Sequence, residues 1–259
     1  MNRLTELMKN KEKNILSIFF TAGYPKLEST VQIIEALNAS GVDLVEIGIP
    51  FSDPIADGPT IQTSSSKALL NGMSLKLLLN QIKDARKKVK EMPFILMGYL
   101  NPIIKYGVEA FFRDANEAGV DALILPDLPF DEYLYDFKGL SRNYNLPIIM
   151  LITPETSEDR IRHIDNNSEG FIYMVSAAST TGAKDKFSQE QLKYFKRINS
   201  LSLKNKRLIG FGISNRQTLD QAFENASGAI IGSHFIKCLD ACCGDEKKAA
   251  AMLLDSLNQ

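Results

Sequence analysis

The stretch VEIGIPFSDPIADGP, residues 45–59, contains a strand of the predicted fold and the first sign of its chemistry. Residues 45–49 form a short apolar, β-branched run that is typical of a buried strand, and one ionisable residue, Glu46, lies within it. Pro50 ends the strand, because proline lacks the N–H group that a strand ladder requires. The stretch therefore predicts a buried strand that carries a carboxylate just before a loop.

Two more carboxylates, Asp53 and Asp57, lie in that loop. Burial raises the pKa of a carboxylic acid toward neutrality unless a cation pairs with it, and such a pKa suits a general acid or base. A strand carboxylate followed by a loop carboxylate therefore indicates an acid/base pair. The alternative is that Glu46 forms a salt bridge and that the aspartates cap turns, because ion-pair networks also bury carboxylates.

Length and composition limit the possible architectures and partners. The 259 residues, 44% of them hydrophobic and 24% charged, suffice for one barrel-sized domain that spans residues 1–259. A net charge of −1 gives no electrostatic reason to expect binding to nucleic acid or to an anionic membrane. Residues 1–14 lack the apolar core of a signal peptide, and no apolar run is long enough to span a membrane, so we expect a cytoplasmic protein.

Strand-like and helix-like segments alternate from end to end. Periodicity and turn residues predict eight strands, at residues 15–22, 45–49, 94–98, 122–126, 148–152, 171–175, 208–211 and 229–231. A short amphipathic helix at residues 4–9 precedes the first strand, and two helices, at residues 61–70 and after Ser74, lie between the second and third. These segments predict an α/β fold, a (β/α)₈ TIM barrel with a short N-terminal helix that plugs one end and an extra helix after strand two.

Eight βα units suggest a closed barrel, and an open doubly wound sheet is the competing fold. The segments SGVD at 40–43 and AGVD at 118–121 each end a helix and begin a strand, 78 residues apart, which indicates a repeated βα architecture. Runs such as residues 122–125 are apolar at consecutive positions, as expected when both faces of a parallel strand are covered. No Gly-x-Gly-x-x-Gly dinucleotide turn follows the first strand, which argues against the open sheet.

Glycine and serine residues follow the last two predicted strands, where barrel enzymes often bind phosphate. GFGIS at residues 210–214 ends strand seven, and Gly232-Ser233 ends strand eight just before a short apolar helix. Backbone N–H groups in such loops and at a helix N-terminus are suited to an anion. Thr181-Gly182, after strand six, would complete the site. A Gly/Ser pair alone is more often a plain turn, but both pairs at the two expected loops favour a phosphate ligand.

Histidine, cysteine and lysine residues argue against a metal or Schiff-base mechanism. His163 and His234 have no partners at metal-ligand spacing, and Cys238, Cys242 and Cys243 share one helical stretch that lacks a fourth ligand. We expect reduced thiols that pack in the helix. No lysine falls within the eight predicted strands, so the usual barrel position of a Schiff-base lysine is empty. The remaining chemistry is proton transfer by carboxylates.

The motifs together resemble a known family, the tryptophan synthase alpha chains, over the whole chain. The resemblance rests on EIGIPFSDP at 46–54, ADGP at 56–59, FFTAGYP at 19–25, MGY at 97–99 with NP at 101–102, PDLP at 126–129, GFGIS at 210–214 and GAIIGS at 228–233. It implies a (β/α)₈ barrel that cleaves indole-3-glycerol phosphate to indole and glyceraldehyde 3-phosphate without metal or cofactor. It also implies a beta chain that holds pyridoxal phosphate and receives the indole within an α₂β₂ tetramer.

The resemblance further implies roles for individual residues. Glu46 would protonate the indole ring carbon, and in its ionised form it, or water, would take the proton from the glycerol hydroxyl. Asp57 would accept the indole N–H and stabilise positive charge on the ring. The substrate-binding residues would be Tyr173 beside Glu46; Phe20, Leu96, Tyr99, Leu125, Phe211 and Ile230 around the indole; and Gly182, Gly212, Gly232 and Ser233 at the phosphate.

One loop departs from the family pattern. After strand six the family usually has Ser-x-x-Gly-Val-Thr-Gly, whereas this chain has SAASTTG at residues 176–182, so that Thr181 and Gly182 are kept and the glycine and valine are replaced. We expect Thr181 to meet Asp57 when the loop closes, although Ser179 lacks the backbone freedom of glycine.

The surface that would meet the beta chain is indicated by apolar residues in two loops. Residues 102–106 follow strand three and Pro50-Phe51 follow strand two, at the end of the barrel where the site is expected. Core packing is the alternative explanation of these residues.

Two other functions fit parts of the pattern. One is another barrel enzyme acting on a sugar phosphate, such as an isomerase, and the other is a ligand-sensing subunit without catalysis. The pair Glu46 and Asp57 argues against both.

Overall fold

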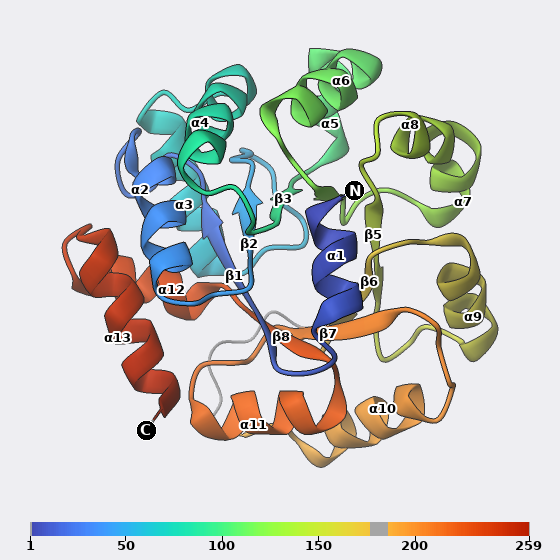
Figure 1. Ribbon diagram of the computed structural model, residues 1–259. Helices are drawn as coiled ribbons and strands as arrows, with labels where there is room; N and C mark the ends of the chain where they lie inside the picture. Colours follow the sequence, from blue (N-terminus) through green and yellow to red (C-terminus); the bar gives the residue numbers. More distant parts are fainter. Residues whose placement is uncertain (1, 177–185, 259) are drawn as a thin grey trace.

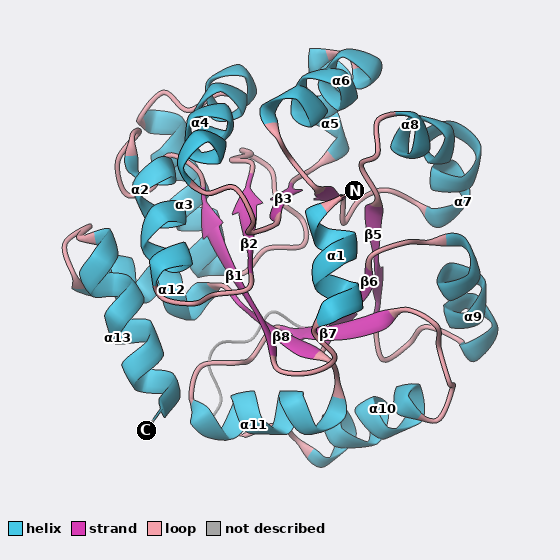
Figure 2. Cartoon of the chain, viewed as in Figure 1, coloured by secondary structure: helices cyan, strands magenta, loops and turns pink. Residues whose placement is uncertain are grey.

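The strands of the protein form a closed parallel barrel. The computed structural model describes residues 2–176 and 186–258. Within them the strands pair in sequence order, and β8 pairs with β1 to close the barrel. Figure 1 looks at the end that α1 covers, and Figure 2 shows the helices around the strands. The strands are β1 (Ile15–Thr21), β2 (Leu44–Gly48), β3 (Phe94–Met97), β4 (Ala122–Ile124), β5 (Ile148–Ile152), β6 (Phe171–Val175), β7 (Lys206–Gly210) and β8 (Gly228–Ile231). The predicted (β/α)₈ barrel is confirmed.

The helices follow the predicted alternation, with two of them between β2 and β3. Ser74 begins the second of these, because its side chain accepts a hydrogen bond from Leu77 N. The predicted extra helix after strand two is therefore confirmed. The described helices are α1 (Arg3–Asn10), α2 (Ser29–Ala39), α3 (Pro59–Leu70), α4 (Leu75–Lys88), α5 (Leu100–Tyr106), α6 (Val108–Ala118), α7 (Phe130–Glu132), η1 (Tyr133–Phe137, a π-helix), α8 (Lys138–Asn143), α9 (Glu158–Asn167), α10 (Gln189–Asn199), α11 (Arg216–Asn225), α12 (Ser233–Ala241) and α13 (Glu246–Asn258).

Strand β7 begins two residues earlier than predicted, at Lys206. Lys206 and Arg207 continue the parallel pairing with β6, so the strand extends beyond its apolar residues. The prediction that no strand contains a lysine is therefore wrong. The Lys206 ammonium donates to the Lys11 carbonyl (2.9 Å) and lies 3.1 Å from the Glu12 carboxylate. It lies at the N-terminal end of its strand, away from the barrel end where catalytic groups are expected.

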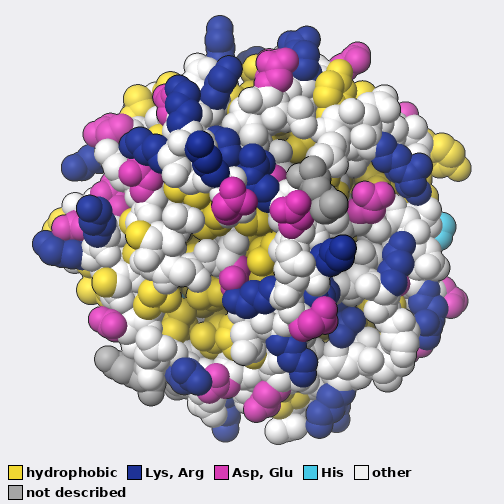
Figure 3. All heavy atoms as spheres, viewed as in Figure 1, with side chains coloured by type: hydrophobic (Ala, Val, Ile, Leu, Met, Phe, Trp, Pro, Cys, Tyr) yellow, Lys and Arg dark blue, Asp and Glu magenta, His cyan; other side chains and the backbone are white. Residues whose placement is uncertain are grey.

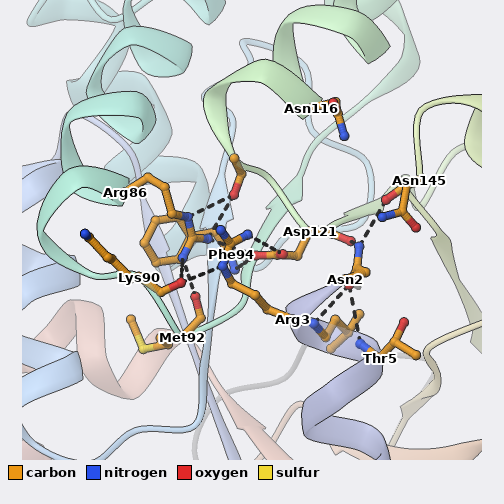
Figure 4. A network of polar contacts seen from close by, with 12 residues as sticks. Asn2, Arg3, Thr5, Arg86, Lys90, Met92, Phe94, Asn116, Asp121 and Asn145 are labelled. Carbon is orange, nitrogen blue, oxygen red and sulfur yellow. Dashed lines mark hydrogen bonds and ion pairs between the residues drawn. The ribbon is translucent and has the colours of Figure 1, made fainter.

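A polar network fixes α1 across the N-terminal end of the barrel (Figure 4). Asp121 is at its centre: its carboxylate lies 3.0 Å from Arg3 Nη1 and 2.8 Å from Arg86 Nη2, and accepts a hydrogen bond from Phe94 N (2.9 Å). The Asn2 amide donates to the Asp121 carbonyl at 2.7 Å. The N-terminal helix is therefore held by charge-assisted hydrogen bonds as well as by its buried apolar residues.

The surface around α1 is mixed in charge. On this face lysine and arginine side chains are interspersed with aspartate and glutamate (Figure 3). Such a mixture lacks the continuous basic area that a polyanion needs on this face. Among the described helices, none has the length and apolar character that crossing a membrane requires.

Candidate active site

Glu46 is fully buried in β2, and among the described residues its carboxyl group is hydrogen-bonded to a hydroxyl group and forms no ion pair. Its side chain has 0% exposure, and Oε1 accepts a hydrogen bond from Ser17 Oγ on β1 at 2.8 Å. Oε2 is buried without a hydrogen-bond partner among the described residues. Burial raises the pKa of Glu46 to about 8, and the bond from Ser17 opposes this rise. The carboxyl group is therefore suited to hold a proton near neutral pH.

Asp57 lies in the loop after β2 and is tethered by Tyr99. The Tyr99 hydroxyl donates to Asp57 Oδ2 at 2.9 Å and accepts from Ala56 N at 3.1 Å, so one side chain holds two neighbouring positions of the loop. Asp57 is 9% exposed, and burial raises its pKa, against the effect of the bond from Tyr99. Asp53, by contrast, is exposed and contacts Ser52. The structure thus separates the two loop aspartates, and only Asp57 is directed into the barrel mouth.

Tyr173 on β6 lies close to both carboxylates. The negative charges of Glu46 and Asp57 add to burial in raising its pKa well above the usual value. Its ring passes over Gly210 on β7, where an added Cβ would overlap the Tyr173 hydroxyl. Gly210 is therefore required as glycine for the ring to reach across the barrel. The ring also meets Phe211 edge-on, with 6.3 Å between centroids.

A pocket at the C-terminal end of the barrel contains Asp57. Its lining comes from β1, β2, β3, α3 and the segments that follow β2, β3 and β4. It consists of Phe19, Gly48, Ile49, Asp57, Ile61, Ser65, Met97, Gly98, Tyr99 and Pro126. Tyr99 is among the residues predicted from the sequence to bind substrate. The other residues predicted for the same wall are absent from this lining: Phe20, Leu96, Leu125, Phe211 and Ile230.

The phase of the strands explains the absence of Phe20, Leu96 and Leu125. In a parallel sheet, paired residues project to the same face and successive residues alternate. Phe19 is paired with Glu46, and Met97 with Gly48, so both share the inner face with the carboxylate. Phe20 and Leu96 are both paired with Ile47 and project to the opposite face, toward the helices.

Leu125 follows the same rule one strand further on. It lies between Ile124, which is paired with Met97, and Pro126, which lines the pocket. By alternation it projects to the outer side.

Phe19 connects this pocket to the N-terminus of α12. A Cβ added at Gly48 would come within 2.6 Å of its ring, and one at Gly232 within 3.3 Å. The ring therefore lies between two glycines that leave room for it. Ile230, predicted to contact indole, is paired with Ser17 and Gly210 and shares their inner face.

The predicted phosphate residues lie at two neighbouring loops. Phe211 and Gly212 both have positive φ, 70° and 78°, directly after β7. Gly232 and Ser233 begin α12, and no side chain caps that helix, so the N–H groups of its first turn are not used by a cap. Thr181 and Gly182 lie outside the described residues.

The histidines and cysteines have local packing partners. His234 Nε2 lies 2.8 Å from Ser256 Oγ and links α12 to α13, while His163 packs edge-on against Phe130. Cys238 is buried, and all three cysteines are free thiols. Over residues 2–176 and 186–258, no group of three or more His, Cys, Asp or Glu side chains is arranged to hold a metal ion.

Three residues that contact the site are not among those predicted from the sequence: Phe19, Met97 and Ser17. Phe19 and Met97 are each one position from a predicted residue, whereas Ser17 is not adjacent to one. Its signal was a hydroxyl within an otherwise apolar strand, ILSIFF at residues 15–20. A polar residue in such a run needs a partner, and here the partner is Glu46.

Comparisons with known proteins give one consistent result. The family model described as tryptophan synthase alpha chain matches residues 4–258. The tryptophan synthase alpha chain of Phocaeicola vulgatus is 53% identical over 257 residues, 99% of each chain, and that of Parabacteroides distasonis is 52% identical over 259 residues, 100% of each. The crystal structure of tryptophan synthase subunit alpha from Legionella pneumophila str. Paris aligns with a TM-score of 0.89 and 35% identity, covering 100% of this chain and 98% of that one. A chain of tryptophan synthase from M. tuberculosis, in an aminoacrylate-bound form, aligns with a TM-score of 0.85 and 29% identity over 99% and 98% of the two chains.

Proposed function

The chain belongs to the tryptophan synthase alpha chain family, and we propose that Glu46 and Asp57 are the acid/base pair with which it cleaves indole-3-glycerol phosphate. The products are indole and glyceraldehyde 3-phosphate. The observation that carries the assignment is Glu46 itself. It is a fully buried carboxyl group with one oxygen bonded to Ser17, the other without a partner among the described residues, and a pKa raised to about 8. Such a group holds its proton at neutral pH and can give it to a substrate atom.

The cleavage needs one proton added and one removed. Glu46 donates its proton to the indole ring carbon that carries the side chain, which makes the ring an electron acceptor. Removal of the proton from the adjacent hydroxyl, by ionised Glu46 or by water, turns its O–H bonding electrons into a carbonyl bond. The carbon–carbon bond breaks, and its electron pair restores the aromatic indole. No net proton is gained or lost.

Asp57 would stabilise the ring while it is protonated. Its carboxylate would accept the indole N–H, whose acidity rises as positive charge develops, and the attraction is strongest at that stage. The bond from Tyr99 supports this role, because it keeps Asp57 turned into the pocket and leaves the other oxygen available. Tyr173 would line the cavity beside Glu46, an assignment supported by the electrostatic coupling of its hydroxyl to both carboxylates.

The apolar wall is better assigned to the residues that line the pocket. Phe19 and Met97 share the inner face with Glu46, and we propose them in place of Phe20 and Leu96. Tyr99 lines the same pocket and remains a candidate for the wall. Phe211 and Ile230 lie outside that lining and remain candidates through the family resemblance.

The phosphate would be bound by backbone N–H groups of Gly212, Gly232 and Ser233. The two loops follow neighbouring strands, β7 and β8, and the start of α12 adds the positive end of a helix dipole. The predicted contribution of Thr181 and Gly182 to phosphate binding stays a prediction.

The alpha chain works with a beta chain, and we propose that the two form an α₂β₂ tetramer in which only the beta chain holds pyridoxal phosphate. Two exposed apolar residues support a partner at the active-site end: Ile55, 81% exposed, and Ile104, 59% exposed, each follow the C-terminal end of a strand. We also propose that residues 1–259 form a single domain and that the protein acts in the cytoplasm.

The decisive experiment measures indole release from indole-3-glycerol phosphate, with and without a beta chain. We expect wild type to release indole, the beta chain to accelerate release several-fold, and Glu46→Gln to bind the substrate but release almost none. Glu117→Gln, which changes an exposed carboxylate, should behave as wild type.

Other outcomes would change the assignment. An active Glu46→Gln would remove Glu46 from the chemistry. If wild type binds the substrate but releases no indole even with the beta chain, the protein is a sensor. If wild type is strongly active without the beta chain, it is an independent lyase.

A further inference from the structure

Phe211 has a backbone conformation that needs support. It is a non-glycine residue with φ of 70°, at the end of β7 and directly before Gly212. L-residues disfavour this left-handed region, because Cβ comes too close to the following carbonyl oxygen. Neighbouring groups must therefore hold the Phe211 backbone, and the contacts that do so determine how the Phe211–Gly212 peptide is oriented.

The Phe211 carbonyl is held by a chain of two side chains. Ser176, at the end of β6, is 1% exposed, and its hydroxyl donates to the Phe211 carbonyl at 2.8 Å. Since that proton is used, the hydroxyl serves as acceptor toward Gln191 Nε2, which lies 3.4 Å away on α10. The chain therefore runs from Gln191 through Ser176 to Phe211 with a defined direction at each step.

The first turn of α10 orients the Gln191 amide. Gln191 is buried, and its Oε1 accepts from Ser188 N at 2.9 Å as part of a capping box. Because the oxygen is committed to the helix cap, the NH₂ group must face Ser176. The helix start thus fixes which end of the amide points toward the barrel.

The orientation of the Phe211 carbonyl determines where the Gly212 N–H points. Both groups belong to one planar trans peptide, so they point in opposite directions. A carbonyl held toward Ser176 therefore turns the Gly212 N–H away from Ser176.

We propose that Gln191 and Ser176 are positioning residues for substrate, which aim the Gly212 N–H at the phosphate and hold the Phe211 ring against Tyr173. The inference rests on the proposed function, in which Gly212 contacts the phosphate. Neither residue touches substrate. Their loss weakens phosphate binding and leaves the proton transfers by Glu46 and Asp57 in place.

The test compares Ser176→Ala, Gln191→Leu and the double variant. We expect KM for indole-3-glycerol phosphate and the inhibition constant of glyceraldehyde 3-phosphate to rise about five- to tenfold, the effect of one lost hydrogen bond, with kcat within about twofold of wild type. Binding of indole, which has no phosphate, should not change. Because the two residues act in series, the double variant should bind the substrate no more weakly than Ser176→Ala alone. Ser176→Thr keeps the hydroxyl and should restore binding.

Two controls separate positioning from stability and from the proposed function. Ser188→Ala removes the hydroxyl cap of α10 but leaves the amide chain, so it should lower the melting temperature and leave KM unchanged. Gly232→Asp puts a negative charge at the start of α12, where an aspartate favours the helix and repels phosphate.

The outcomes distinguish the two ideas. If Gly232→Asp leaves inhibition by glyceraldehyde 3-phosphate unchanged, the phosphate site is wrong and the positioning role fails with it. If Gly232→Asp weakens inhibition while folded Ser176→Ala does not, only the positioning role is overturned. The positioning role is also overturned if the effects of Ser176→Ala and Gln191→Leu on KM add in the double variant. If Gln191→Leu does not fold, the comparison of KM between Ser176→Ala and Ser176→Thr tests the positioning role.

Discussion

At the scale of single residues, the burial of Glu46 determines its protonation and so its chemistry. The barrel interior offers its carboxyl group one hydroxyl donor, Ser17, and none of the ion pairs among the described residues includes it. Ionisation in this environment is costly, because full burial shields the carboxylate from bulk solvent and no described residue forms an ion pair with it. The neutral acid is therefore the stable form at neutral pH.

The pH dependence of kcat/KM should report this protonation. Glu46 must hold its proton to act as an acid, so activity should fall as pH rises through about 8. Asp57 must be ionised, and burial raises its pKa, so the acidic limb should lie above the usual range of an aspartate. Steady-state assays across pH, with circular dichroism to show that the fold persists, check both limbs. Constant activity well above pH 8 would contradict the assigned acid.

Stability should depend on pH through the same residue. The folded-state pKa of Glu46, about 8, lies above the ordinary glutamate value of 4.5, so the folded protein keeps a proton that the unfolded chain has lost between these values. Wild-type stability should therefore fall as pH rises through this window, by at most about 1.4 kcal/mol per pH unit from this group. The glutamine of the Glu46→Gln variant does not titrate. The variant should therefore gain stability relative to wild type as pH rises through the same window.

Urea unfolding at pH 5, 6, 7 and 8 measures the difference between the two proteins. Glu117→Gln, an exposed carboxylate, should show a difference that does not change with pH. A constant difference for Glu46→Gln as well would mean that Glu46 is ionised in the folded protein throughout.

At the scale of elements, the repeated Gly-Val-Asp segments link neighbouring strands. Asp43, just before β2, accepts a hydrogen bond from Leu16 N on β1 at 2.8 Å, and Asp121, just before β4, accepts one from Phe94 N on β3. Each aspartate thus joins the start of its own strand to the start of the preceding one. The Gly-Val-Asp repeat in the sequence therefore corresponds to the same hydrogen bond, formed at two places in the barrel.

Removing these two aspartates should have unequal effects on stability. Asp121→Ala leaves the Arg86 guanidinium, 11% exposed, without its carboxylate, and should cost about 3–5 kcal/mol, the range for a broken buried pair. Asp43→Ala frees Lys11, which is 38% exposed and can turn to water, and should cost about 1–2 kcal/mol. Free energies of unfolding in urea give both values, and equal losses would argue against a special role for the Arg86 pair.

At the scale of the whole molecule, the two ends of the barrel have different tasks. The N-terminal end is closed by α1 and the Asp121 network (Figure 4), whereas Glu46, Asp57 and the loops after β7 and β8 lie toward the C-terminal end. This separation allows the binding loops to vary without loss of the residues that hold the barrel together.

The exposed apolar residues at the C-terminal end should bind the beta chain. Ile104→Asp puts a charge on an exposed position of α5, so the fold should persist while beta-chain binding weakens tenfold or more. Titration of beta-chain activation by the variant measures the loss. Met252→Asp, on the exposed side of α13, is the matched control and should bind as wild type. Unchanged binding by Ile104→Asp would remove α5 from the interface.

The sequence by itself determined the number and order of the strands and their alternation with helices. Buried parallel strands appear as apolar runs, and Gly41 and Gly119 end helices with positive φ, so these signals are local in the chain. Glu46 was also visible locally, as a carboxylate within such a run. Asp53 and Asp57 were both visible as loop carboxylates, and it was the family resemblance, not the local pattern, that assigned the role to Asp57.

Tertiary structure alone decided which residues face the site. A strand that is apolar at every position does not indicate which of its residues project into the barrel. Only the register with β2 shows that Phe19, and not Phe20, and Met97, and not Leu96, share the inner face with Glu46. The partner of Glu46 and the contacts of Ser176 join residues that are 29, 15 and 35 positions apart. Such contacts depend on how the barrel closes, and no local pattern in the chain encodes a distance between elements.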